Sequence, residues 1–211
     1  MNQQELYITE IFYSIQGESF DAGYPCVFVR LSGCDLRCIW CDTEYSFKRG
    51  QRMSFAEILD QVESYGVHRV EITGGEPLLQ KNSISFMEIL LEKGFRVLLE
   101  TGGHRSLSEV PKDVIKIMDL KCPGSGMEKK NLYSNLQFLI PHQDQVKFVL
   151  ANRNDYEFAK KKIQKHSIPL DMVLLSPVWE SLPPRDLAKW VLEDRLEVKI
   201  QLQLHKILSL P

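Results

Sequence analysis

Long apolar runs are missing from this 211-residue sequence. No stretch approaches the roughly 18 apolar residues of a membrane span, and the opening MNQQELYITE lacks the basic flank and apolar core of a secretion signal. Blocks of like charge are also missing, since 26 basic and 28 acidic side chains are spread along the chain and give a formal net charge of −2. We therefore expect a cytoplasmic protein that binds neither a membrane nor nucleic acid.

Internal repeats and low-complexity segments are absent, which argues against a repeat array. The length and the 44% hydrophobic composition are sufficient for one domain with a substantial core, and we expect residues 1–211 to form that domain.

Short β-branched runs alternate along the chain with longer amphipathic stretches. The predicted strands are residues 26–32, 69–73, 95–100, 114–120, 145–150, 172–176 and 197–203. The predicted helices are residues 54–65, 82–93, 154–166 and 183–194. Such alternation indicates an α/β fold, but a complete (β/α)8 barrel needs about 250 residues. We expect an incomplete (β/α)6-type barrel of mostly parallel strands, with ligands at the carboxyl ends of the strands.

Several residues mark where the predicted helices begin. Ser54 followed by Glu57 is a capping box for the first helix. Asn154 and Asp155 are candidate caps for the third helix, and Pro183 with Pro184 suits the start of the fourth.

Cysteine is scarce, and its odd count of five suits a disulfide framework poorly. Three of the five, Cys34, Cys38 and Cys41, stand in the pattern C-x3-C-x2-C, which favours metal ligation in a reducing compartment. A structural zinc site would need a fourth ligand, for which Cys122 or His104 is available, and an electron-transfer cluster would need four thiolates. The residues alone therefore leave two alternatives, a zinc site completed from another loop or an iron site with an open position.

The segment CDLRCIWC, from Cys34 to Cys41, resembles the signature of the radical S-adenosylmethionine superfamily, in which an aromatic residue precedes the last cysteine. The segment ITGGEPLLQ at residues 72–80 is similar to the superfamily's second motif. The resemblance implies a partial barrel in which the three thiolates bind a [4Fe-4S] cluster, and in which the fourth iron binds S-adenosylmethionine. Gly74 and Gly75 would let the backbone approach this cofactor closely.

Further segments resemble the family of 7-carboxy-7-deazaguanine synthases. They are FYSIQGES at residues 12–19, VFVRLSGCDLRCIWCDT at 27–43, ETGG at 100–103 and QLQLHK at 201–206. The likeness runs from about residue 8 to the end of the sequence. It implies a lyase that converts 6-carboxy-5,6,7,8-tetrahydropterin to 7-carboxy-7-deazaguanine with loss of ammonia, in queuosine and 7-deazapurine biosynthesis.

The resemblance also implies roles for individual positions, although it implies no catalytic acid or base. The residues implied to bind the pterin substrate, with Glu18 in support, are Ile15, Gln16, Gly17, Arg30, Thr73 and Pro211. The residues implied to bind S-adenosylmethionine are Trp40, Cys41, Asp42, Gly75, Asp119, Leu120 and Lys121. The implied metal ligands are Cys34, Cys38 and Cys41 for the cluster and Thr43 for Mg2+.

One segment departs from the family pattern, because many members have SPK where this chain has Asp119, Leu120 and Lys121. Only Lys121 keeps its residue type there, and Cys122 beside it is interpreted as a bystander thiol.

The family further implies a homodimer and an electron donor of the flavodoxin or ferredoxin type. Two other functions remain open, a glycyl-radical activase and a small metal-binding adaptor with no affinity for S-adenosylmethionine.

Overall fold

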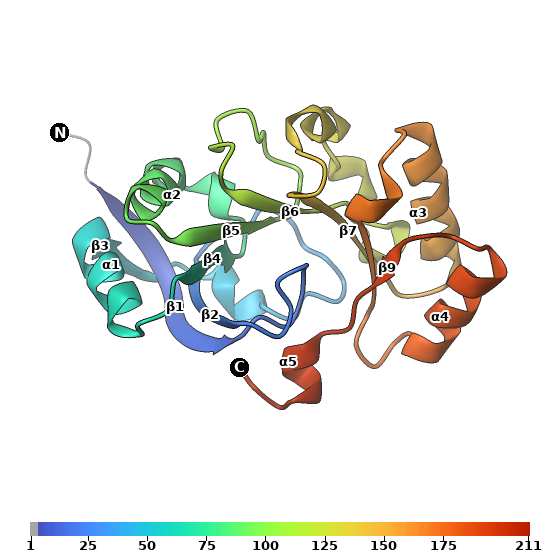
Figure 1. The fold of residues 1–211 in the computed structure, drawn as a ribbon, viewed down its shortest axis with the longest axis horizontal. Coiled ribbons are helices and arrows are strands. Elements are labelled where there is room, and N and C mark those ends of the chain that lie inside the picture. The colour runs from blue at the N-terminus through green and yellow to red at the C-terminus, as the bar shows by residue number, and fades with distance from the viewer. Residues whose placement is uncertain (1–3) are drawn as a thin grey trace.

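The computed structural model describes residues 4–211, which form a curved sheet with helices α1 to α4 around its outside (Figure 1). The strand order in the sheet is β3-β1-β2-β4-β5-β6-β7-β8-β9. The strands are β1 (Glu5–Ile15), β2 (Pro25–Leu31), β3 (Gln51–Ser54), β4 (Arg69–Gly74), β5 (Arg96–Thr101), β6 (Ile115–Asp119), β7 (Gln145–Leu150), β8 (Val173–Pro177) and β9 (Lys199–Ile200). The helices are α1 (Phe55–Ser64), α2 (Asn82–Glu92), α3 (Arg153–Lys165), α4 (Pro184–Glu193) and α5 (Leu204–Ile207).

Neighbouring strands pair in parallel from β2 through β9, whereas β1 pairs antiparallel with both β2 and β3. This arrangement confirms the predicted α/β fold, an incomplete barrel of mostly parallel strands. The sequence reading missed β1, β3 and α5, and it made β9 too long, because only two of the seven residues predicted there pair with β8. The first three residues, which the predicted domain includes, lie outside the described part of the chain.

The two faces of the sheet differ in chemistry because successive side chains of a strand point to opposite faces. On β4, Val70 and Ile72 belong to the main hydrophobic core, which the helices cover. Glu71 and Thr73 of the same strand line a cavity on the inner face. The curvature of the sheet therefore gathers the polar residues of several strands around one enclosed space.

Helix starts follow the predicted capping, with one exception. Ser54 and Glu57 form the capping box of α1, and α4 begins at Pro184. The prediction for α3 was wrong, because the Asn152 side chain, not Asn154, accepts the hydrogen bond from the amide of Asp155. Within residues 4–211, no helix is both long and apolar enough to cross a membrane.

Candidate active site

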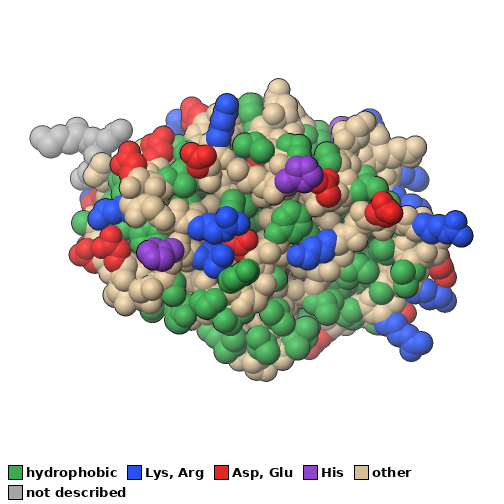
Figure 2. All heavy atoms as spheres, in the orientation of Figure 1, with side chains coloured by type: hydrophobic (Ala, Val, Ile, Leu, Met, Phe, Trp, Pro, Cys, Tyr) green, Lys and Arg blue, Asp and Glu red, His purple; other side chains and the backbone are tan. Residues whose placement is uncertain are grey.

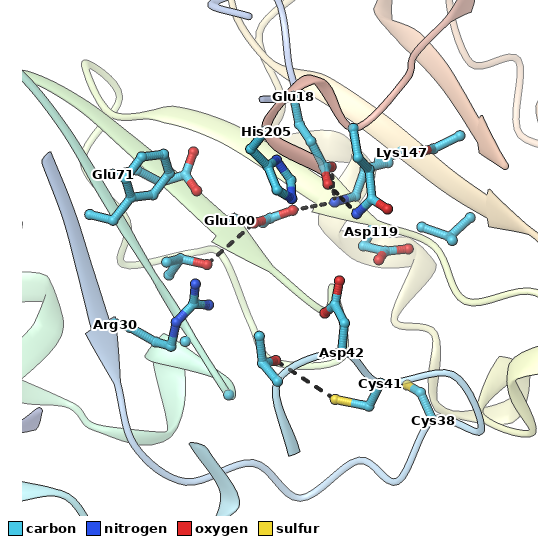
Figure 3. A pocket seen from close by; sticks show the side chains of 18 of the residues that line it. Glu18, Arg30, Cys38, Cys41, Asp42, Glu71, Glu100, Asp119, Lys147 and His205 are labelled. Carbon is cyan, nitrogen blue, oxygen red and sulfur yellow. Dashed lines mark hydrogen bonds and ion pairs between the residues drawn. The ribbon is translucent and has the colours of Figure 1, made fainter. Parts of the chain in front are cut away.

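A cavity of about 600 Å³ opens at the carboxyl ends of the barrel strands, on the inner face of the sheet (Figure 3). Its walls come from the cysteine loop after β2, the GGEP loop after β4 and the ends of β5 to β8. The segment that contains α5 adds the remaining wall, including His205 and Pro211. This is the edge of a parallel sheet at which α/β proteins bind ligands.

The three clustered cysteines all line this cavity, and none is in a disulfide. Burial raises the pKa of Cys34 and of Cys38, so a positive charge nearby is needed to keep these thiols ionised. No three His, Cys, Asp or Glu side chains within residues 4–211 are grouped as ligands of a single metal ion. The cysteines therefore share a cavity without forming a preassembled site for one ion.

The GGEP loop packs directly against the cysteine loop. A Cβ atom on Gly75 would lie 2.2 Å from the carbonyl oxygen of Gly33 and 2.9 Å from the Cβ of Cys34, so only glycine fits there. The next residue, Glu76, is fully buried, and its carboxylate accepts hydrogen bonds from the Thr101 hydroxyl and the Gly102 amide. Glu76 thereby fixes the GGEP loop to the loop after β5, beside the cysteines.

Buried charges occupy the floor of the cavity. The ammonium of Lys147, on β7, lies 2.8 Å from Glu18 and also pairs with Glu100 at the end of β5 (Figure 3). Burial alone would raise the pKa of Glu100, but the Lys147 charge outweighs it and holds that pKa below its usual value. Burial would likewise lower the pKa of Lys147, and the two carboxylates instead raise it well above the usual range. Lys147 and Glu100 therefore stabilise each other's charged form.

Glu71 of β4 differs from these charged acids. Burial, and then the nearby Glu100, raise its pKa well above the usual value. Its Oε2 accepts a short hydrogen bond from Nε2 of Gln16, which comes from the loop between β1 and β2. The cavity therefore holds one acid with a lowered pKa, Glu100, and one with a raised pKa, Glu71.

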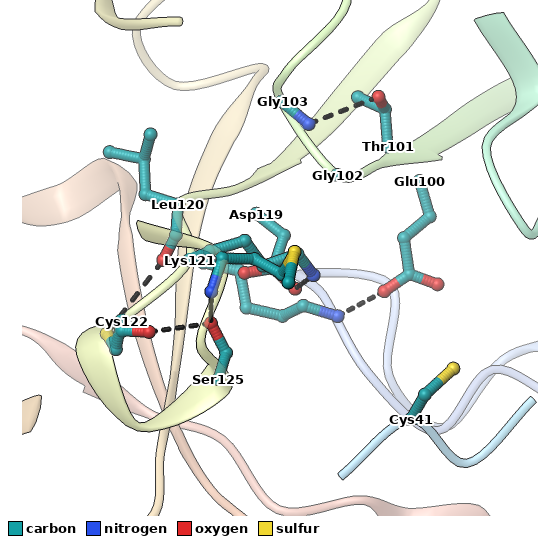
Figure 4. A network of polar contacts seen from close by, with 12 residues as sticks. Cys41, Glu100, Thr101, Gly102, Gly103, Asp119, Leu120, Lys121, Cys122 and Ser125 are labelled. Carbon is teal, nitrogen blue, oxygen red and sulfur yellow. Dashed lines mark hydrogen bonds and ion pairs between the residues drawn. The ribbon is translucent and has the colours of Figure 1, made fainter. Parts of the chain in front are cut away.

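The segment after β6 brings a second buried ion pair to the cavity (Figure 4). Lys121 Nζ lies 2.7 Å from Asp119 Oδ2, and this carboxylate outweighs burial to raise the pKa of the lysine. The other oxygen, Asp119 Oδ1, is buried and has no hydrogen-bond partner among the described residues. Cys122 points away from the cavity into the core, so it cannot complete a zinc site with the other three cysteines.

Several contacts hold the segment around α5 at the cavity, among them hydrogen bonds from Gln203 to Glu18 and from the Leu204 amide to the Gly17 carbonyl. Lys206 Nζ lies 2.9 Å from Asp42 Oδ2 in the cysteine loop. The Ser14 hydroxyl donates a 2.9 Å hydrogen bond to the carbonyl of Pro211. These contacts join the segment around α5 to β1 and to the cysteine loop, which lie far from it in the sequence.

The structure brings nearly all the predicted site residues together. Those that line the cavity are Ile15, Gln16, Arg30, Cys34, Cys38, Trp40, Cys41, Asp42, Thr43, Thr73, Gly75, Asp119, Lys121 and Pro211. Gly17 lies outside the cavity and packs against His205, since a Cβ there would lie 2.0 Å from that ring's Nδ1. Leu120 is a core residue whose amide donates to the carbonyl of Lys147, so its side chain does not face the cavity.

Sequence reasoning missed the acids and the lysine on the cavity floor. Glu71, Glu100 and Lys147 each stand within or at the end of a predicted strand, and parallel strands are usually buried on both faces. A charged residue in such a strand was the available signal, because a buried charge requires a partner.

A family model, related sequences and a solved structure all match this chain. The model of the Radical SAM superfamily matches residues 28–123. A 7-carboxy-7-deazaguanine synthase from Koribacter versatilis is 46% identical over 98% of each chain, and one from Chlorobaculum tepidum is 44% identical over 98% of this chain and 95% of that protein. The crystal structure of QueE from Escherichia coli has a similar fold, with a TM-score of 0.76 over 95% of each chain at 21% identity.

Proposed function

The chain belongs to the 7-carboxy-7-deazaguanine synthase family of radical S-adenosylmethionine enzymes, and on that premise we propose how its cavity performs the family's reaction. As a single domain, it converts 6-carboxy-5,6,7,8-tetrahydropterin to 7-carboxy-7-deazaguanine and releases ammonia, in 7-deazapurine biosynthesis. The observation that carries this proposal is that the three cysteines, the GGEP loop, Arg30 and Pro211 line one cavity of about 600 Å³.

Cys34, Cys38 and Cys41 hold the [4Fe-4S] cluster in this proposal. The thiols suit such a cluster because the iron charge offsets the burial that raises the pKa of Cys34 and Cys38. Thiolates that bind different iron atoms also need not converge on one point, as ligands of a single ion do. When bound, the cluster and S-adenosylmethionine supply the radical chemistry, and the protein supplies position and exclusion of water.

The GGEP loop and the end of β6 would hold S-adenosylmethionine, since Gly75, Asp119 and Lys121 line the same cavity as the cysteines. Gly75 lets the GGEP loop pack directly on the cysteine loop, which brings both loops to the same wall of the cavity. The unpartnered Asp119 Oδ1 suits a hydroxyl donor of the cofactor, since a buried acceptor without a partner costs about 1–3 kcal/mol. Trp40 and Asp42 lie on the adenosine side, and Lys121 holds Asp119 in place.

Arg30 binds the carboxylate of the pterin. Its Nε donates a 2.7 Å hydrogen bond to Glu10, which leaves the terminal nitrogens of the guanidinium directed into the cavity (Figure 3). A guanidinium fork matches the two oxygens of a carboxylate. The substrate ring then lies over Ile15, Gln16, Thr73 and Pro211.

A Mg2+ ion bound by Thr43 completes the substrate site in this proposal. The Thr43 hydroxyl lines the cavity beside Cys41, and Mg2+ prefers oxygen ligands. Arg30 stands on the same side of the cavity, so one carboxylate can contact both the guanidinium and the ion.

A flavodoxin or ferredoxin-type donor reduces the cluster at the surface around Ile39. This side chain lies between Cys38 and Cys41 and is 75% exposed, so the protein covers the cluster thinly there. The thiols must stay reduced until the cluster is inserted, which fits the cytoplasm.

A homodimer would cover exposed apolar side chains. Leu202, Ile207, Leu208 and Leu210 are each at least 40% exposed. Figure 2 has a concentration of apolar atoms in the region that contains α5 in Figure 1. Large exposed apolar patches commonly mark protein contacts.

Anaerobic reconstitution with iron and sulfide tests the proposed function. We expect about four irons per chain, cleavage of S-adenosylmethionine, and 7-carboxy-7-deazaguanine when 6-carboxy-5,6,7,8-tetrahydropterin is added. A chain that binds one zinc would support the adaptor, and a chain that cleaves the cofactor but leaves the pterin unchanged would support the activase. Either result would contradict the proposal.

A further inference from the structure

The proposed function does not account for Glu71, an acid on the inner face of β4, two positions before Thr73. The residue is 4% exposed and lines the cavity, and its chain neighbours Val70 and Ile72 are core residues. A buried carboxyl without a countercharge is costly, so its presence in the floor of a binding site requires an explanation.

The hydrogen bonds of Gln16 fix the orientation of its side-chain amide. Its Oε1 accepts a 3.1 Å hydrogen bond from the backbone amide of Glu18, which can only donate. The amide nitrogen, Nε2, therefore faces Glu71 and donates to its Oε2. One of the two Nε2 hydrogens is used in this way, and the second remains available to a ligand in the cavity.

The charges around Glu71 favour its neutral form. It is faced by Glu18 from the loop after β1, Glu100 from β5, Lys147 from β7 and the Cys26 thiol of β2. Lys147 is the single cation in this set, and it already pairs with Glu18 and Glu100.

We propose that Glu71 is a substrate-positioning residue that acts through Gln16. It holds the amide of Gln16 with the second Nε2 hydrogen directed at the substrate, so that Gln16 donates to an acceptor atom of the pterin ring. Ionisation of Glu71 places a third negative charge beside Glu18 and Glu100 and disturbs this arrangement. The inference rests on the proposed function, in which Gln16 contacts the pterin.

Two substitutions separate the hydrogen bond from the charge. Glu71→Gln keeps an oxygen that can accept from Gln16 and carries no charge at any pH. Glu71→Val has no acceptor and leaves the Gln16 amide free to rotate. Glu63→Gln is the control for loss of a carboxylate, because Glu63 lies on the surface in a pair with Lys93.

The measurements are anaerobic calorimetric titration of the reconstituted, cofactor-loaded enzyme with 6-carboxy-5,6,7,8-tetrahydropterin, and steady-state kinetics from neutral to mildly alkaline pH. For Glu71→Val we expect Kd and KM to rise about tenfold or more, as for a lost hydrogen bond at a buried site, while kcat changes little. Glu71→Gln should bind within about threefold of the unsubstituted enzyme at neutral pH. The Kd of Glu71→Gln for the pterin should stay level as pH rises, whereas the Kd of the unsubstituted enzyme should increase.

Two results would overturn the inference. One is an unchanged Kd in the valine variant, and the other is an alkaline loss of binding that persists in Glu71→Gln. Iron content and cofactor cleavage without pterin, measured on the same samples, report whether each variant is intact. If the unsubstituted enzyme neither binds nor converts the pterin, the proposed function itself is wrong. If the unsubstituted enzyme converts the pterin but the two variants behave otherwise than expected, only the inference about Glu71 is wrong.

Discussion

Removing the ammonium of Lys147 should destabilise the protein far more than removing a surface lysine. The side chain is 6% exposed, and it lies between Glu18, which is 15% exposed, and Glu100, which is 29% exposed. Lys147→Met keeps the length of the side chain but leaves two carboxylates without their cation. Breaking a buried ion pair costs about 3–5 kcal/mol, and we take about 3 kcal/mol because Glu100 keeps access to the cavity. For a chain of this size that loss lowers Tm by about 6–12 °C.

Lys93→Met is the matched control. Lys93 pairs with Glu63 at 3.1 Å, but both side chains are more than 40% exposed, so its loss should cost at most about 0.5 kcal/mol. Urea and thermal unfolding of the three proteins at neutral pH measure the difference. Equal losses in the two variants would refute the view that Lys147 holds two charged acids in place.

The pH dependence of this loss has a definite sign. In the unsubstituted protein the pKa of Glu100 is lowered, so its favourable contribution is present above the ordinary glutamate pKa and is lost as pH falls. Without Lys147, nothing outweighs the burial that raises the pKa of Glu100, so Glu100 is protonated more readily as pH falls. The stability gap between the unsubstituted protein and Lys147→Met should therefore narrow toward acidic pH. A stability difference that widens toward acidic pH would contradict the view that Lys147 stabilises the ionised form of Glu100.

Other substitutions test the remaining assignments. Cys38→Ala should prevent assembly of the cluster, which loss of the broad visible absorption band and of bound iron would report. Thr43→Ala should retain the cluster but shift the Mg2+ dependence of turnover to higher concentrations, and unchanged Mg2+ dependence would remove Thr43 from the metal site. Arg30→Lys should raise KM for the pterin about tenfold, because a lysine cannot offer the bidentate fork, while cofactor cleavage alone persists. Gly17→Ala should displace the segment around α5, since the new Cβ would lie 2.0 Å from Nδ1 of His205, and faster proteolysis after α4 would report that displacement.

The fold could be predicted where a strand was apolar and followed by a helix. β7 was predicted with its observed bounds, and α1 was found from its capping box. β1 was missed because it is an antiparallel strand outside the strand-helix alternation, with a burial pattern that does not repeat cleanly. β9 was made too long, since the chain leaves the sheet at Gln201, and that side chain donates to Glu18 instead.

The site could be predicted wherever a short motif fixes the chemistry, as for the cysteines and Gly75. The floor of the cavity could not, because its pairs join residues far apart in the sequence. Lys147 and Glu18 are separated by 129 positions, and Gln16 and Glu71 by 55. A strand sequence can reveal that an unusual charge is present, but only the register of the sheet determines which partner it meets.

The segment around α5 has a consequence for handling the protein. Pro211 lines the cavity and its carbonyl accepts a hydrogen bond from Ser14, so residues joined after Pro211 would extend from the rim of the binding site. Removal of this segment would open the cavity on the side that His205 and Pro211 now close, and would expose the three clustered cysteines to solvent from that side.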